Sequence, residues 1–235
     1  IGGVVVDALE LKRKIKSEKS IFSIYPQLEK NNWIRVDIHR RENLTPRRFR
    51  SIIGAVKDLV KKGYNINFIE MSATRMALDF YSLRKELDKL KKRKNFLYTS
   101  VWPEYGHVME FFESDNCIAA LTDSGGVQEE LNILGKACMT CRLTTDRPET
   151  VFDAKSNIIV PPASKDLIIE MVQYITSNDN LRKKMESSKS LYGKNAGEKL
   201  ISTVSQLMKK DDNPFKWAHD TLKLWRDNEK GVNYL

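Results

Sequence analysis

Short apolar runs alternate along this chain with longer segments of helical periodicity, and this alternation constrains the fold more than any other feature of the sequence. The short runs are typical of strands, and apolar residues that recur every three or four positions are typical of helices. Strands that alternate with helices form βαβ units and a parallel sheet. Several runs are almost continuously apolar, as expected for strands that are covered on both faces. The expected strands span residues 33–38, 65–69, 96–98, 117–121, 137–141 and 157–160.

The helical segments complete the pattern of an α/β protein with a doubly wound, Rossmann-like parallel sheet. The first segment after a strand, residues 46–62, starts at Pro46 and stops before Gly63, a residue suited to a left-handed helix terminus. A basic helix is expected over residues 7–19, ahead of the first strand. The other expected helices span residues 76–93, 105–113, 127–134, 165–176, 180–188 and 197–209, and a final helix at 215–227 follows a polar linker.

Charge and cysteine usage argue against several classes of function. The net charge is +9, but the basic runs at 12–19 and 84–94 are interleaved with acidic residues, which indicates solvated helix faces and no nucleic-acid partner. No stretch approaches the ~20 apolar residues that span a bilayer, so no membrane partner is expected. Three cysteines do not make a secreted disulfide framework, so we expect a cytoplasmic protein. Cys138 and Cys141 form a C-x-x-C pair on an expected strand, and without companion ligands they predict buried thiols and no metal.

Parallel sheets of this kind bind ligands beyond the carboxyl ends of their strands, so we looked for chemistry directly after each run. His39, Arg40, Arg41, Glu42 and Asn43 follow the first strand. An imidazole transfers protons near neutral pH, and a guanidinium grips phosphate oxygens with a planar fork. From the residues alone, the alternative remains that this segment is a surface loop whose histidine caps the next helix.

Two more polar loops follow later strands. Ser124, Gly125 and Gly126 stand between the fourth strand and its helix, where free backbone N–H groups can hold a phosphate. Glu130 lies one turn into that helix and could accept the hydroxyl groups of a ribose. After the fifth strand, residues 142–150 include two arginines. A tight turn capped by Ser124, and a solvated loop with internal Asp–Arg pairs, are the alternatives.

Together these loops resemble the non-hydrolysing UDP-N-acetylglucosamine 2-epimerases. The motifs H-R-R-E-N, T-D-S-G-G-[IV]-Q-E-E and L-G-K-x-x-x-x-R-x-T-T-[ED]-R-P-E of that family stand at residues 39–43, 122–130 and 134–149, in the same order and with matching spacing. Tyr192-Gly193 is similar to a later Tyr-Gly motif, and residues 5–9 are similar to the hinge that follows the first domain. The resemblance covers roughly residues 1–210.

The resemblance implies one half of a GT-B-type fold, in which two Rossmann-like domains enclose the active site. Residues 1–30 would be the hinge and leading helix from a first domain, 31–210 the UDP-binding domain, and 211–235 a C-terminal helix that crosses back. Because the chain starts at Ile1 inside the hinge-like segment, we expect a first domain in cis or as a complementing subunit. The sequence leaves open whether the protein forms a homodimer.

The resemblance also implies a reaction and a set of residues. UDP is eliminated from UDP-GlcNAc and added back with inverted configuration at C2 to give UDP-ManNAc, without a cofactor. His39 would be catalytic, because it would reach the reacting sugar or its phosphate. The substrate-binding residues would be Arg40, Glu42 and Asn43 after the first strand, Ser124, Gly125 and Gly126 at the diphosphate, Glu130 at the ribose and Arg147 beside the nucleotide.

Two departures from the family pattern keep other functions open. The strand at 65–69 should precede a Pro-x-His-x-Asn loop, but residues 70–75 contain no histidine. In the later motif Lys194-Asn195 replaces a glycine pair. One alternative is the donor-binding subunit of a split GT-B sugar enzyme. The other is a catalytically dead module that binds a UDP-sugar for regulation. No uridine contact is assigned within residues 103–107.

Overall fold

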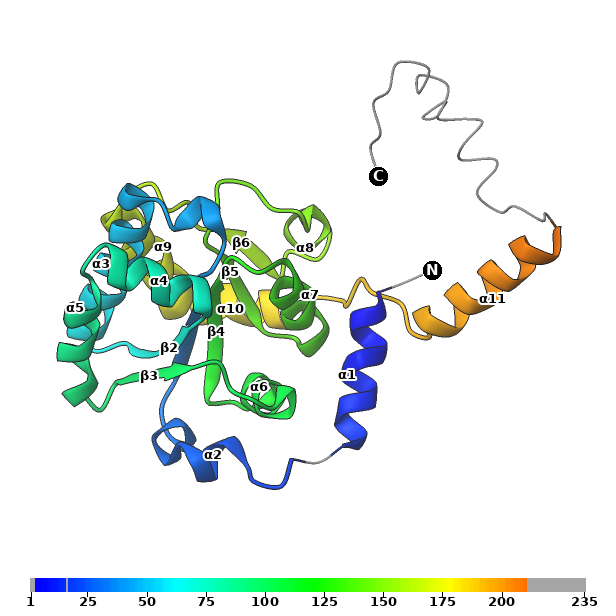
Figure 1. Ribbon diagram of the computed structural model, residues 1–235, viewed down its shortest axis with the longest axis horizontal. Coiled ribbons are helices and arrows are strands. Elements are labelled where there is room, and N and C mark those ends of the chain that lie inside the picture. The colour runs from blue at the N-terminus through cyan, green and yellow to red at the C-terminus, as the bar shows by residue number, and fades with distance from the viewer. Residues whose placement is uncertain (1–2, 16, 211–235) are drawn as a thin grey trace, which may run out of the picture.

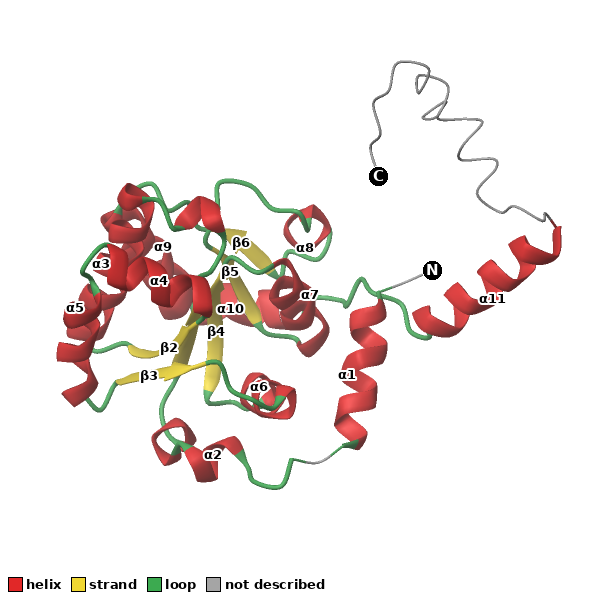
Figure 2. Ribbon diagram, viewed as in Figure 1, coloured by secondary structure: helices red, strands yellow, loops and turns green. Residues whose placement is uncertain are grey.

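A computed structural model of the protein describes residues 3–15 and 17–210. At its centre lies a six-stranded sheet in the order β3-β2-β1-β4-β5-β6, with every pairing parallel (Figure 2). This is the strand order of the doubly wound Rossmann fold, so the predicted fold class is confirmed. The strands are β1 (Trp33–Asp37), β2 (Asn65–Glu70), β3 (Phe96–Ser100), β4 (Cys117–Thr122), β5 (Ala137–Thr140) and β6 (Asn157–Ile159).

Each face of the sheet is covered by its own apolar cluster, because successive side chains of a strand point to opposite faces. Ile34 and Val36 of β1 belong to one cluster, and Trp33 belongs to the other. The first cluster includes side chains of α3 (Pro46–Lys61) and α9 (Lys165–Ser177), and the second includes side chains of α6 (Tyr105–Glu113) and α7 (Gly125–Leu134).

Two glycines end helices as their positions require. Gly63 follows α3 with a φ of 98°, as the sequence predicted. Gly135 ends α7 with a φ of 66°, and a Cβ atom at this position would lie 2.9 Å from the carbonyl oxygen of Glu186. A larger residue at Gly135 would therefore be strained and would also push α7 away from α10 (Asp179–Glu186).

The helix predicted over residues 76–93 is wrong as a single element. The segment forms α4 (Ser72–Phe80), α5 (Arg84–Asp88) and the 3-10 turn η3 (Lys89–Lys92). Ser82 interrupts it with a φ of 57°. The apolar spacing of this segment does continue through Leu83, but a break in backbone conformation leaves no periodic signal in the sequence.

The leading helix, predicted over residues 7–19, starts and ends earlier than predicted. It is α1 (Val4–Lys14), in which Val6 and Leu9 are buried, so the apolar opening of the chain is the first turn of this helix. Short elements escaped prediction because a single turn carries too few apolar positions to show a period. These are α2 (Ile21–Ile24), η1 (Pro26–Glu29), η2 (Arg41–Asn43) and α8 (Pro148–Phe152).

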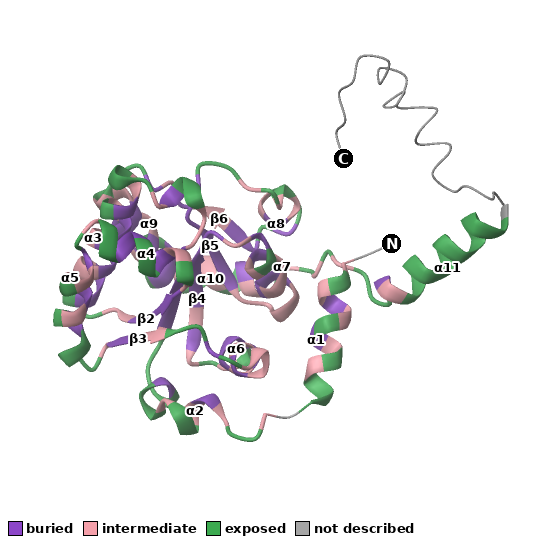
Figure 3. Ribbon diagram, in the orientation of Figure 1, coloured by how far each residue is buried: buried purple, intermediate pink, exposed green. Residues whose placement is uncertain are grey.

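The last described helix, α11 (Ala196–Lys210), extends away from the body of the domain (Figure 1) and is largely exposed (Figure 3). Its start lies beside α1. The helix predicted over 215–227 lies outside the described residues. Within residues 3–15 and 17–210, no helix is both long enough and apolar enough to cross a bilayer.

Candidate active site

The order of the strands reverses between β1 and β4, and a doubly wound sheet opens a crevice for a ligand at such a point. The chain leaves β1 into residues 39–43 and leaves β4 into residues 123–130. The third polar segment, residues 142–150, follows β5, which is the neighbour of β4. The three predicted binding loops therefore meet at one edge of the sheet.

Asp123 joins the first two loops. It is fully buried at the end of β4, and its carboxylate accepts hydrogen bonds from the backbone N–H groups of His39 at 3.0 Å and Arg40 at 2.9 Å, and from Nδ2 of Asn43 at 2.9 Å. Burial raises the pKa of the Asp123 carboxyl, and these donors oppose the rise. Sequence reasoning gave Asp123 no role, since its partners lie 80 to 84 residues away.

The His39 ring lies beside the same carboxylate. Its Nδ1 atom is 3.2 Å from Oδ1 of Asp123, although the two are not aligned as a hydrogen bond, and the side chain is 30% exposed. The buried carboxylate holds one edge of the imidazole, while the exposed part of the ring leaves room for a reacting group. This is the arrangement that an acid–base histidine needs.

Asn43 lies inside the loop and not on its surface. It is fully buried, and its amide also donates to the carbonyl oxygen of Cys141 at 2.7 Å. Asn43 thus links the end of β5 to the loops after β1 and β4. Its Nδ2 donates both hydrogen bonds within the protein, while its Oδ1 has no partner among the described residues, so substrate binding by Asn43 stays a prediction.

The start of α7 has the form of an anion site. The Ser124 side chain caps the helix by accepting from the N–H of Val127 at 3.4 Å, so the predicted capping role is present. The first N–H groups of a helix have no acceptor inside it, and here they belong to Gly125 and Gly126, which carry no Cβ atom to block a ligand. The cap and the open N–H groups are compatible with each other.

Glu130 of α7 is partly buried, and among the described residues its side chain has one hydrogen-bond partner. The hydroxyl of Tyr105 donates to Oε1 of Glu130 at 2.8 Å. Burial, together with the charge of Asp37, raises the pKa of Glu130 to about 7, against the effect of the Tyr105 hydrogen bond. Sequence reasoning made no assignment in the segment that contains Tyr105, because the spacing of that segment departs from the family motif.

Arginines from two loops converge on Asp146. Arg142 Nη1 lies 3.0 Å and Arg40 Nη2 lies 3.1 Å from the Asp146 carboxylate, and Arg142 also binds Glu42 at 2.8 Å. Burial would raise the pKa of Asp146, but a backbone hydrogen bond and the two arginines hold it below its usual range. Arg147 binds Glu129. Arg40, Arg142 and Arg147 therefore each have an acidic partner that a phosphate would have to replace.

Comparison with known proteins agrees with this geometry. A sequence model of the family described as UDP-N-acetylglucosamine 2-epimerase matches residues 1–205. The chain belongs to that family. The epimerase of Methanocaldococcus jannaschii is 28% identical over 211 residues, which cover 87% of this chain and 54% of the relative. The epimerase of Neisseria meningitidis is 28% identical over 88% of this chain and 54% of its own length. The chain thus spans about half the length of these relatives.

Solved structures of the family extend the comparison. The M. jannaschii UDP-GlcNAc 2-epimerase in complex with UDP-GlcNAc and UDP superposes with a TM-score of 0.72 at 27% identity, over 88% of this chain and 54% of that one. The N. meningitidis enzyme bound to UDP-GlcNAc gives a TM-score of 0.66 at 27% identity, over 88% and 54%. The architecture is therefore that of one half of these GT-B epimerases.

The loop after β2 departs from the family pattern, because residues 70–75 contain no histidine. Glu70 is buried at the end of β2, and its carboxylate binds Arg75 Nε at 2.6 Å and Arg84 Nη1 at 2.7 Å and accepts from Tyr98. Burial would raise the pKa of Glu70, but Tyr98 and the two arginines hold it below its usual range. A closed ionic network occupies the place where the family pattern has a histidine.

The second departure, in the late motif, places Asn195 at a backbone position that a glycine would also fit. Asn195 has a φ of 59°, a left-handed conformation that asparagine tolerates better than other residues with side chains. Asp7 of α1 accepts from the N–H groups of Asn195 and Gly197, each at 2.8 Å. The hinge-like segment and the late motif, far apart in sequence, are therefore held together.

The cysteines are buried, as predicted. Cys138 and Cys141 carry free thiols, and burial raises the pKa of Cys138 to about 12 and also raises that of Cys141. Among the described residues, no group of three or more histidine, cysteine or acidic side chains is arranged to hold a metal ion. The thiols are thus protonated core residues at neutral pH.

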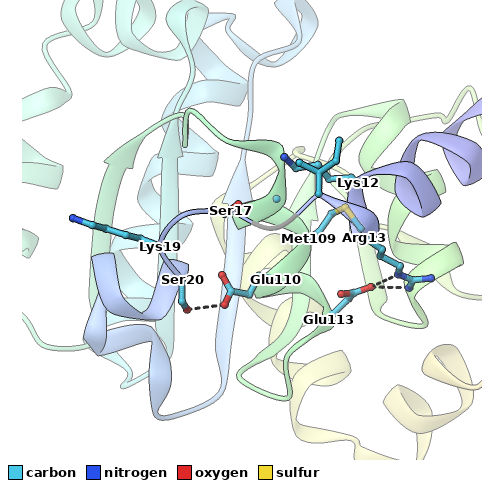
Figure 4. Close-up of a pocket in the computed structure, with 10 residues that line it drawn as sticks. Lys12, Arg13, Ser17, Lys19, Ser20, Met109, Glu110 and Glu113 are labelled. Atoms are coloured by element: carbon cyan, nitrogen blue, oxygen red, sulfur yellow. Dashed lines mark hydrogen bonds and ion pairs between the residues drawn. The ribbon is translucent and has the colours of Figure 1, made fainter.

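A hollow of about 340 Å³ between α1 and α6 is separate from this site (Figure 4). Arg13 binds Glu113 at 2.6 Å and Ser20 donates to Glu110 at 2.6 Å along its wall. None of the predicted nucleotide-binding residues lines it. These pairs attach the leading segment to α6, and the hollow remains between them.

Proposed function

We propose that this chain supplies the UDP-binding half of an active site that interconverts UDP-GlcNAc and UDP-ManNAc. The observation that carries the proposal is the meeting of the loops after β1, β4 and β5 at the switch point of the sheet. Crevices at such points bind nucleotides in unrelated doubly wound proteins. Family membership, and the UDP and UDP-GlcNAc bound to two solved relatives, support the choice of ligand.

Each group has a role that its chemistry supports. The N–H groups at Gly125 and Gly126 would bind the diphosphate beside the positive end of α7, next to the Ser124 cap. Glu130 in its ionised form would accept the ribose hydroxyls in place of Tyr105. Arg147 would exchange Glu129 for the nucleotide.

The loop after β1 would face the sugar. His39, with Asp123 beside its Nδ1, would exchange a proton with the reacting sugar or its leaving phosphate as UDP is eliminated and added back. Arg40 and Glu42 would lie at the cleft between domains. The elimination needs no cofactor.

We further propose that the first domain of the family completes the cleft, in cis or as a separate polypeptide. The described site faces water, where a charge that develops during elimination gains little from its neighbours. The chain alone should therefore bind UDP without turning over UDP-GlcNAc. A cytoplasmic location and a homodimer remain predictions.

The test is reconstitution with a family first domain, followed by proton NMR of the anomeric signals in deuterium oxide. We expect interconversion of the two sugar nucleotides with exchange at C2, and His39→Ala should lower turnover about 100-fold. UDP affinity of His39→Ala, measured in parallel, controls for damage to the site. Turnover by the 235-residue chain alone would refute the half-site proposal.

A UDP-sugar-binding module without turnover is the second candidate. The closed network of Glu70, Arg75 and Arg84 favours it, because it stands where the family pattern has a histidine. A folded two-domain assembly that binds UDP-GlcNAc but yields no epimer would select this candidate.

A further inference from the structure

The Asp146 carboxylate lies beside Gly125 at the start of α7, next to the proposed diphosphate position. Its carboxylate oxygens are 3.0 and 3.2 Å from the position that a Cβ atom would occupy on Gly125. The same oxygens bind Arg142 Nη1 and Arg40 Nη2. The positive end of a helix and two guanidinium groups therefore surround a carboxylate that belongs to the protein itself.

We propose that Asp146 is an internal substitute for the diphosphate, which leaves its place when UDP binds. The proposal rests on the proposed function, because it takes the start of α7 to be the diphosphate site. Asp146 suits this role since its side chain is 40% exposed and can turn outward without leaving a buried charge. Its low pKa keeps it ionised at neutral pH.

The role would make Asp146 a competitor of phosphate, in contrast to a residue that only positions the arginines. As a competitor, it lowers affinity for any anion at this site and keeps the two arginines neutralised while the site is empty. As a positioning residue, it would raise that affinity by holding Arg40 and Arg142 in place. The two roles predict opposite signs for the same substitution.

The experiment is titration calorimetry of the 235-residue chain and of Asp146→Asn with UDP, pyrophosphate and uridine at one fixed ionic strength. We expect Asp146→Asn to bind UDP and pyrophosphate about three- to tenfold more tightly, the scale of two partly exposed ion pairs. Uridine, which has no phosphate, should bind both proteins equally. Asp153→Asn, an equal change of charge at the exposed end of α8, is the matched control and should change UDP affinity less than twofold.

Weaker or unchanged binding of UDP by Asp146→Asn, with UDP bound by the unsubstituted chain, would overturn the competitor role and leave the proposed function standing. An equal gain in Asp153→Asn would also overturn it, because net charge would then explain the effect. No binding of UDP by either protein would overturn the competitor role together with the nucleotide site.

Discussion

Two networks of arginine and carboxylate stand at the same edge of the sheet and differ in burial. After β2, Glu70 binds Arg75 and Arg84, and its side chain is 8% exposed. After β5, Asp146 binds Arg142 and Arg40 at slightly longer distances, and its side chain is 40% exposed.

Burial decides what each network can do. The carboxylate of Glu70 has little access to the solvent that would let it change partners, so its network stabilises the loop in one form. Asp146 can be solvated when it leaves its arginines, so its network can exchange a carboxylate for a phosphate. Similar residues at the ends of β2 and β5 would thus serve structure in one place and, under the proposed competitor role, ligand binding in the other.

The largest effect should come from removal of the buried carboxylate. Glu70→Ala leaves Arg84 and the Tyr98 hydroxyl without their shared partner, so we expect the free energy of unfolding to fall by about 2–4 kcal/mol. Urea denaturation measures this. Asp79→Ala removes an exposed partner of the same Arg84 and should lower the free energy of unfolding far less than Glu70→Ala does. Loss of UDP affinity in folded Glu70→Ala would contradict the division between the networks.

Glu130→Gln should change how stability depends on pH. Between the ordinary carboxyl pKa of 4.5 and the raised pKa of about 7, the folded protein holds a proton that the unfolded chain has lost. Stability from this group is therefore present below pH 4.5 and is lost as the pH rises through 7. Relative to the unsubstituted chain, Glu130→Gln should gain of order 1–3 kcal/mol at pH 8 and little at pH 4.

The measurement for Glu130→Gln is thermal or urea unfolding at both pH values. UDP affinity of the unsubstituted chain should fall below about pH 7, because the protonated carboxyl accepts ribose hydroxyls poorly. A difference between the two proteins that does not change with pH would show that Glu130 is not titrating in this range.

Asn43→Ala tests whether protein stability and UDP binding are coupled in the loops after β1, β4 and β5. The substitution removes amide hydrogen bonds to the buried Asp123 carboxylate and to the Cys141 carbonyl, so we expect a loss of about 1–2 kcal/mol. It should also weaken UDP binding, because the loops after β1, β4 and β5 lose their common anchor. A loss of stability with unchanged UDP affinity would place Asn43 with the structural residues only.

The smallest effect is expected at Asn195, the departure from the family pattern in the late motif. Asn195→Gly should leave stability almost unchanged, whereas Asn195→Ala should cost about 1 kcal/mol, because alanine is strained at a φ of 59°. The two substitutions control each other in one urea series. Equal losses in both would show that the asparagine side chain itself carries the effect.

Local patterns in the sequence predicted the structural features that are set by residues close together in the chain. Apolar runs and glycine positions predicted the six strands and the end of α3, and the three loops predicted which strand ends carry polar groups. The break at Ser82 depends on one backbone angle that no periodicity reports. Partners such as Asp123 and Tyr105 could not be predicted, since their roles arise from contacts between loops that only the folded sheet brings together.

The central claim, that this half-site binds UDP through Glu130 and the start of α7, is tested most directly by titration of the chain with UDP. The account predicts a Kd between about 1 μM and 1 mM, or roughly −8 to −4 kcal/mol, since the contacts are local but the closing domain is a separate half. Glu130→Ala should weaken the binding of UDP and leave the binding of inorganic phosphate nearly unchanged. No UDP binding at millimolar concentration, or an unaltered Kd in Glu130→Ala, would contradict it.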